Sequence, residues 1–98
     1  MDAQTQNHVE TTAYAVKLVY FSWVRERIGV AEETVSLPSS VQTVADLLAW
    51  LKTQSDNHAA ALEFPDIIRV ALDQTHVENA APIGHAREIA LFPPMTGG

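Results

Sequence analysis

The chain has 98 residues, a net charge of −6 and no cysteine, which together exclude several classes of protein. This length suits one domain with a single modest hydrophobic core. Six scattered Lys and Arg residues argue against a nucleic-acid partner, and the acidic balance favours a basic protein partner instead. Without cysteine there is no disulfide, no thiolate nucleophile and no Cys-metal site.

Residues 1–13, MDAQTQNHVETTA, are polar and lack both the basic start and the apolar core of a signal peptide. No stretch of the chain approaches the roughly 18 apolar residues of a membrane span. We therefore expect a flexible N-terminal extension over residues 1–13, a cytoplasmic protein and no membrane partner.

Residues 14–22, YAVKLVYFS, predict the first strand, because apolar residues alternate along it. Lys17 marks the outer face of this strand. The inner face would then carry Val16, Leu18 and Tyr20, and the outer face Val19 and Phe21.

The next segments predict a short helix and a second strand. Residues 23–28, WVRERI, form a helical turn that Gly29 would end. Residues 32–37, EETVSL, predict a strand that Pro38 ends. Because this strand follows the first so closely, we expect the two to pair antiparallel.

The clearest helix covers residues 43–53, where apolar residues recur at helical spacing in one stripe. Thr43 and Asp46 approximate a capping box at its start. Trp50 lies off the stripe and is expected to cover the flank of the helix. The stripe consists of Val44, Leu47, Leu48 and Leu51.

After this helix we expect a shorter helix over residues 56–63, followed by three strands. A main strand covers residues 67–72, IIRVAL, with Ile68, Val70 and Leu72 alternating against Arg69 and Ala71. A turn at residues 73–75 leads to a short strand near residues 76–77, and residues 88–92, EIALF, form the last strand.

The order β-β-α-short α-β-short β-β indicates an α+β fold of the β-grasp, or ubiquitin-like, type. In it one main helix covers one face of a mixed sheet of four to five strands. The domain is expected over residues 14–92, with the first and last strands adjacent and parallel at the centre. Residues 93–98 then form an extended tail.

The outer face of this sheet is a candidate partner surface. Strand parity places apolar residues there beside His76, where solvent would otherwise lie. A loop that covers the face, or a register error of one residue, would remove this surface. The apolar residues are Val19, Phe21, Ala71 and Phe92.

Nothing in the chain predicts an independent active site or a bound metal. The four histidines, at positions 8, 58, 76 and 85, do not pair at ligand spacing, and phosphate-binding and nucleophile motifs are absent. The acidic residues fall mostly on predicted helix surfaces, at helix starts or in turns, where charge is normally solvated.

The chain ends in Pro93, Pro94, Met95, Thr96, Gly97 and Gly98. The prolines fix φ and remove two backbone donors, so the segment must leave the sheet extended. Six residues can reach about 20 Å, and two glycines would pass through a narrow active site with the α-carboxylate leading. Adenylation by an ATP-dependent partner would let this carboxylate accept sulfur or an amine. The alternative is an ordinary frayed terminus.

Three segments resemble the small, sulfur-carrying subunits of molybdopterin synthase, and the resemblance covers about residues 15–98. Residues 19–29, VYFSWVRERIG, are similar to the family's apolar strand followed by V-R-E-x-x-G. Residues 70–74, VALDQ, and 91–98, LFPPMTGG, are similar to further family segments, the latter to its F-P-P-V-(S/T)-G-G ending. Asp73 and His76 depart from the family, which often has Asn and an apolar residue at these positions.

The resemblance implies a carrier without intrinsic cofactors. Gly98 would be adenylated by an E1-like, ATP-using enzyme and converted to a thiocarboxylate with a sulfur-transferring protein. Residues 93–97 would insert into the large synthase subunit, which supplies the catalytic residues, and sulfur would pass to cyclic pyranopterin monophosphate. The synthase would contain two small and two large subunits, and the interface would include Phe21, His76 and Phe92.

Three alternatives remain open from the sequence. The chain could carry sulfur for thiamine or another pathway, although its length and its F-P-P-x-T-G-G tail argue against the thiamine carriers. It could be a ubiquitin-like modifier that forms isopeptide bonds through Gly98. It could also be a β-grasp module that binds a partner without covalent chemistry.

Overall fold

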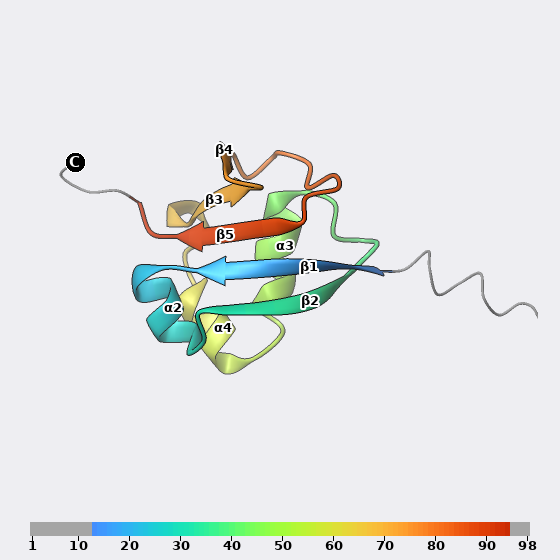
Figure 1. Ribbon diagram of the computed structural model, residues 1–98. Coiled ribbons are helices and arrows are strands. Elements are labelled where there is room, and N and C mark those ends of the chain that lie inside the picture. The colour runs from blue at the N-terminus through green and yellow to red at the C-terminus, as the bar shows by residue number, and fades with distance from the viewer. Residues whose placement is uncertain (1–12, 95–98) are drawn as a thin grey trace, which may run out of the picture.

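The computed structural model describes residues 13–94 and is built around a mixed five-stranded sheet. The strands lie in the order β2-β1-β5-β3-β4. Parallel pairing joins β1 to β5, and the other neighbours are antiparallel. The strands are β1 (Ala13–Tyr20), β2 (Glu32–Pro38), β3 (Arg69–Leu72), β4 (Thr75–Val77) and β5 (Glu88–Phe92). The predicted β-grasp order is therefore confirmed, with the first and last strands adjacent and parallel (Figure 1).

Helices follow the predicted positions and lie together on one side of the sheet (Figure 1). They are α2 (Ser22–Ile28), α3 (Val44–Leu51), α4 (Asp56–Ala61) and the 3-10 turn η1 (Pro65–Ile67). Gly29 ends α2 in the left-handed region at φ 102°, a conformation that glycine adopts without steric cost. The capping box of α3 is present, since Thr43 accepts from the Asp46 amide at 3.1 Å and Asp46 accepts from the Thr43 amide at 3.1 Å.

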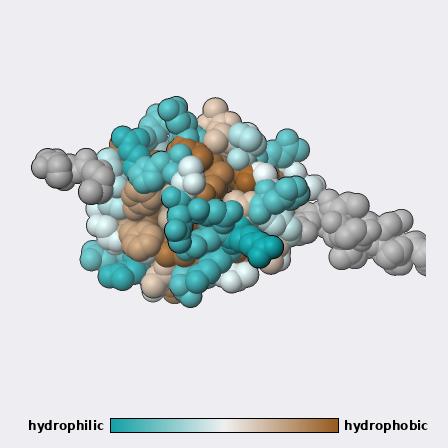
Figure 2. Space-filling view, turned by 45° about the horizontal axis from the view of Figure 1, so that its top comes forward, coloured by the Kyte–Doolittle hydropathy of each residue, from teal (hydrophilic) through white to brown (hydrophobic). Residues whose placement is uncertain are grey.

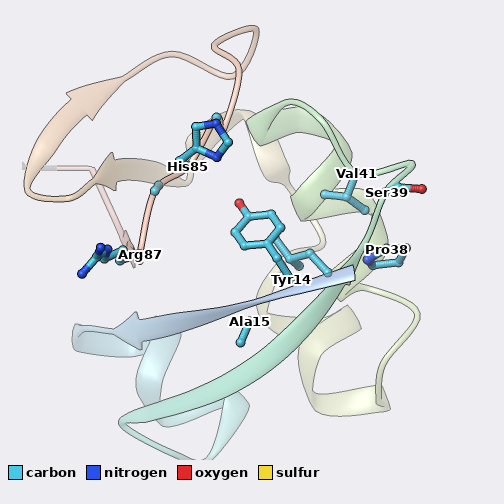
Figure 3. Close-up of a pocket in the computed structure, with 10 residues that line it drawn as sticks. Tyr14, Ala15, Pro38, Ser39, Val41, His85 and Arg87 are labelled. Carbon is cyan, nitrogen blue, oxygen red and sulfur yellow. The ribbon is translucent and has the colours of Figure 1, made fainter. Parts of the chain in front are cut away.

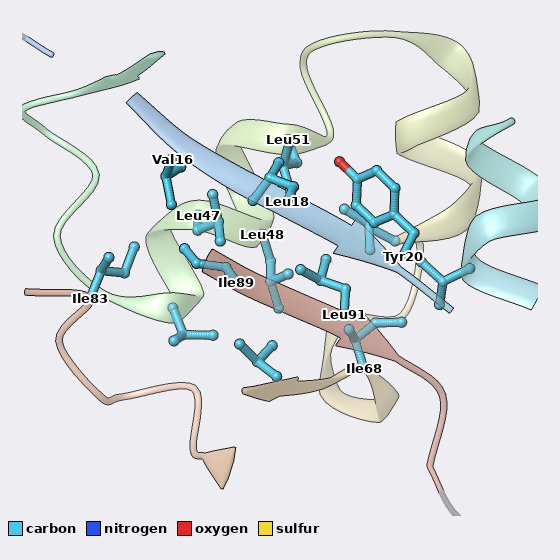
Figure 4. Close-up of a cluster of buried hydrophobic side chains, with 14 of the residues drawn as sticks. Val16, Leu18, Tyr20, Leu47, Leu48, Leu51, Ile68, Ile83, Ile89 and Leu91 are labelled. Atoms are coloured by element: carbon cyan, nitrogen blue, oxygen red, sulfur yellow. The ribbon is translucent and has the colours of Figure 1, made fainter. Parts of the chain in front are cut away.

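The hydrophobic core fills the space between α3 and the inner face of the sheet (Figure 4). The side chains predicted to face inward from β1 are all buried, and the stripe of α3 packs against them. Trp50 packs against the edge of this core, as predicted. Each fully buried aliphatic side chain contributes about 1.5–3 kcal/mol. The largest fully buried members from the sheet are Leu18, Tyr20, Leu37, Ile89 and Leu91.

Two predicted strand boundaries are wrong by two residues each, and the others differ by one residue at most. The first strand ends at Tyr20, because Ser22 adopts φ 57° and begins α2. The third strand begins at Arg69, because the amides of Ile67 and Ile68 donate to Phe64 and Pro65 within η1. Backbone groups used in that turn cannot pair with β5. The expected extension over residues 1–13 lies outside the described residues, except that Ala13 begins β1.

Candidate functional site

Three aromatic rings form a row on the sheet face that the helices leave uncovered. The rings of Phe21 and Phe92 meet edge to face with centroids 6.5 Å apart. The His76 ring lies 5.2 Å from that of Phe92. Figure 2 shows hydrophobic side chains exposed on this side of the molecule among more polar ones. We call Phe21, His76 and Phe92 the aromatic row; they are the three residues expected at a partner interface.

The prediction that Ala71 is exposed on this face is wrong. Its side chain is on the expected face but is only 6% exposed. Ala71 lies on β3 directly between His76 of β4 and Ala90 of β5. The rings of His76 and Phe92 come from the two flanking strands, and their centroids lie 5.2 Å apart. Ala71 therefore contributes little to the exposed surface of this face.

Phe21 is held beside the end of β5 by the backbone. Its amide donates to the Leu91 carbonyl at 3.1 Å, and Phe21 is the N-cap residue of α2. Ser22 then turns the chain away from the sheet in the left-handed region, which costs energy for a residue other than glycine. Phe21 consequently remains at the corner of the sheet, 48% exposed.

The tail begins at the same corner. Phe92 is the last residue of β5, and Pro93 and Pro94 follow it outside any strand. Because β1 and β5 are parallel, the tail leaves the sheet at the end where Phe21 lies. The remaining predicted site residues, Met95, Thr96, Gly97 and Gly98, lie outside the described residues.

The two departures from the family pattern have clear structural roles. Asp73 and Gln74 form the two-residue turn between β3 and β4, with φ values of 49° and 74°. The Asp73 carboxylate accepts from the amides of Arg87 and Glu88, both at 3.0 Å. An Asn side-chain oxygen could accept the same bonds, so Asp73 preserves the start of β5. His76 places its imidazole ring against the ring of Phe92.

A polar network on the inner face joins β1, β2 and α4, and sequence reasoning missed it. The Tyr20 hydroxyl donates to Glu33 at 2.6 Å, and Nε2 of His58 lies 2.7 Å from the same oxygen. Partial burial acts to raise the pKa of Glu33, but the bonds from Tyr20 and His58 outweigh it and lower that pKa below its ordinary value of 4.5. Burial, followed by the neighbouring Glu33, raises the pKa of Tyr20.

The role of this network is structural: it holds α4 against the sheet. Ser55 caps α4 by accepting from the His58 amide, and its hydroxyl contacts Nδ1 of His58 at 2.7 Å. Both ring nitrogens of His58 are therefore occupied, and its side chain is 12% exposed. Strand parity could have placed Glu33 on the inner face, but its partner His58 is 25 residues away in sequence.

A cleft of about 490 Å³ lies at the other end of β1 and β5 from the aromatic row. Figure 3 shows the Tyr14 hydroxyl pointing toward His85 across this space. Burial, followed by the charge of Asp73, raises the pKa of Tyr14. The residues that line the cleft lie at the opposite end of the sheet from Pro93 and Pro94.

Residues 13–94 contain no group of three or more side chains that could hold a metal ion. In the same part of the chain no helix is long and apolar enough to cross a membrane.

Comparisons with known proteins agree with this geometry. Residues 18–98 match the ThiS family. The chain is 35% identical to the molybdopterin synthase sulfur carrier subunit of Escherichia coli, over 85% of this chain and 99% of that protein. The solved structure of SAMP1 from Haloferax volcanii, a small archaeal modifier protein, is 26% identical and has a TM-score of 0.64, covering 87% of this chain and all of that one.

A chain from the complex of subunits 1 and 2 of the molybdopterin-converting factor of Helicobacter pylori shares the fold. Its TM-score is 0.56 at 21% identity, over 87% of this chain and all of that one.

Proposed function

The chain belongs to the ThiS family, and from this membership we propose that it is the sulfur carrier subunit of molybdopterin synthase, acting through the carboxylate of Gly98. The observation that carries the proposal is the extent of the family match, which runs through the tail to Gly98. The similarity therefore includes the chain end and not the domain alone. The 35% identity to the molybdopterin synthase sulfur carrier subunit of E. coli, over 99% of that protein, supports this pathway among those of the family.

The proposed chemistry begins with a carboxylate that is a poor electrophile. An E1-like partner would join the Gly98 carboxylate to the AMP portion of ATP, releasing pyrophosphate. A persulfide on a sulfur-transferring protein would then attack the acyl carbon and displace AMP, and a thiol of that protein would cleave the resulting acyl disulfide, which leaves the thiocarboxylate on this chain and a disulfide on the donor. In the synthase the sulfur would pass to cyclic pyranopterin monophosphate, and the chain would return to a carboxylate. ATP is used by the partner enzyme, and this chain acts as the carrier.

The residues of this chain would position the reacting end. Residues 95–98 can extend about 14 Å beyond Pro94 at roughly 3.3–3.6 Å per residue. Pro93 and Pro94 restrict the backbone and cannot donate to a further strand, which keeps the tail directed away from the sheet. The aromatic row beside its start would give a partner an apolar surface.

The main partner in this proposal is the large subunit of molybdopterin synthase. The complex of two molybdopterin-converting factor subunits from H. pylori contains a chain with the same fold, which supports a two-subunit arrangement. We propose a heterotetramer of two small and two large subunits, with Phe21, His76 and Phe92 at the interface and residues 93–97 inserted into the large subunit.

Reconstitution tests this proposal. The thiocarboxylated full-length chain is combined with a large subunit and cyclic pyranopterin monophosphate, and molybdopterin is measured. The matched control carries the same domain without Gly98. We expect product only from the full-length chain. Equal product from both chains, or none from the thiocarboxylated chain in the presence of a large subunit shown to bind it, would contradict the proposal.

A second function, conjugation to other proteins as a modifier, is favoured by one observation. The small archaeal modifier protein SAMP1 shares 26% identity and the whole fold. A modifier would form amide bonds from Gly98 to lysine amines, with AMP as the leaving group. Mass spectrometry of protein adducts from the native cell separates the functions, because a modifier yields lysine-linked peptides that end in Gly97–Gly98 and a sulfur carrier does not.

A further inference from the structure

Two exposed apolar side chains beside η1 have no role in the core. Phe64 is 63% exposed and Ile67 is 41% exposed. Large apolar side chains of this exposure are few among residues 13–94, and these two lie within four positions of each other. The amide of Ile67 donates to the Phe64 carbonyl at 3.1 Å, so the turn itself holds both residues in a fixed relation.

The strand register places this turn next to the start of the tail. β3 and β5 are antiparallel, and Arg69 lies opposite Phe92. The turn η1 ends at Ile67, two residues before Arg69, and Pro93 directly follows Phe92, so the turn and the start of the tail both adjoin this pair of residues. Figure 1 shows the turn between α4 and β3 at the end of the sheet where β5 ends.

Phe21 lies on the other side of the same exit. The sheet order places β5 between β1 and β3, and Phe21 follows β1 with its amide bonded to Leu91. The tail thus starts between Phe21 on one side and the segment from Phe64 to Ile67 on the other. We call Phe21, Phe64 and Ile67 the apolar rim.

We infer that Phe64 and Ile67 are a second docking contact for the large synthase subunit, on the side of the tail opposite Phe21. This inference rests on the proposed function and adds a part of the interface to it. Gly98 lies no more than about 14 Å beyond Pro94, so a protein that holds Gly98 in its active site must bring its surface close to the rim. The side chains around the start of the tail would then contact the surface that surrounds the partner's active site.

The expected size of the interface favours the large subunit over the adenylating enzyme as the protein that contacts Phe64 and Ile67. A stable complex buries about 800 Å² on each partner through roughly 20–30 residues. The aromatic row supplies three side chains, so a lasting subunit interface needs further apolar contacts close to it. An enzyme that releases the chain after each cycle needs fewer contacts.

A groove of about 520 Å³ lies between the segment around η1 and the end of β4. Asp66 and Ile68, from the segment around η1, line it together with Arg69 and Glu78. A partner that covers Ile67 would therefore meet a polar border directly beyond the apolar contact, the arrangement common at protein interfaces.

The test measures the affinity of the full-length chain for the large subunit by calorimetry, with four variants. Phe64→Ala and Ile67→Ala should each weaken binding, the former by about tenfold or more because exposed aromatic anchors dominate interface energies. Phe64→Leu should recover most of the affinity. Tyr14→Ala is the matched control, since Tyr14 is an aromatic residue of 37% exposure at the other end of the sheet, and it should bind like the unmodified chain.

The outcomes separate the inference from the proposed function. Circular dichroism and thermal melting establish that each variant is folded. If the unmodified chain binds and the Phe64→Ala and Ile67→Ala variants bind equally well, the inference is wrong and the proposed function stands. If those variants lose adenylation by the E1-like enzyme while binding of the large subunit is unchanged, the inference is also wrong. If the unmodified chain does not bind any large subunit, the proposed function itself fails.

Discussion

Replacing Tyr20 with Phe isolates the polar network between β1, β2 and α4. Tyr20 is 1% exposed, so the substitution removes one hydroxyl from a packed ring and leaves no large cavity. That hydroxyl donates to Glu33 at 2.6 Å. Hydrogen bonds to charged groups contribute about 1.5–3 kcal/mol. Because the Glu33 side chain is 30% exposed, we expect the lower end, a loss of about 1.5 kcal/mol in the free energy of unfolding.

Chemical denaturation followed by tryptophan fluorescence measures this loss, and a melting temperature lower by about 6 °C or more should accompany it. Tyr14→Phe is the control, because Tyr14 is partly exposed and lies at the other end of β1. This control should change the free energy of unfolding by less than about 0.5 kcal/mol.

The loss should also depend on pH. Folding lowers the pKa of Glu33 below 4.5, so its ionised form adds stability above that value, and this stability disappears as the pH falls through the lower folded pKa. The difference in the free energy of unfolding between Tyr20→Phe and the unmodified chain should be constant between about pH 5 and 7. It should become smaller below about pH 4.5. Equal unfolding free energies at all of these pH values would refute the network as a source of stability.

Three further predictions concern the fold that positions the tail, each measured as a free energy of unfolding. Gln74→Gly should stabilise the protein by about 0.5 kcal/mol, because Gln74 adopts φ 74° at a cost that glycine does not have; a loss of stability would contradict this. Thr43→Ala should cost about 1 kcal/mol through the lost α3 cap, whereas an unchanged value would show that the cap is dispensable. Leu48→Ala, at a buried position, should cost about 2–5 kcal/mol, and a cost below about 1 kcal/mol would indicate that the core relaxes.

Local patterns predicted most of the fold. The alternation in β1, the stripe and cap of α3 and the glycine end of α2 each depend on residues close in sequence, and each is confirmed. The parallel pairing of β1 and β5 followed from the order of the elements. Boundaries failed where a local turn competed with a strand, as at Ile67, whose amide is used within η1.

The candidate site was also predicted in part, because strand parity depends on residues close in sequence. Parity placed Phe21, His76 and Phe92 on one face, and their rings do meet. Parity could not show that Ala71 is only 6% exposed, because burial depends on the side chains of the neighbouring strands. The contact between Glu33 and His58 joins residues that only the packing of α4 against the sheet brings together.

The most direct test of sulfur carriage is the intact mass of the full-length chain before and after each step of a reconstituted cycle. After incubation with the E1-like enzyme, ATP and a sulfur donor, the mass should rise by the difference between one sulfur and one oxygen atom. After addition of the large subunit and cyclic pyranopterin monophosphate, it should return to its starting value as molybdopterin forms. A chain that acquires the sulfur and keeps it while the bound large subunit and precursor remain unreacted would contradict the account.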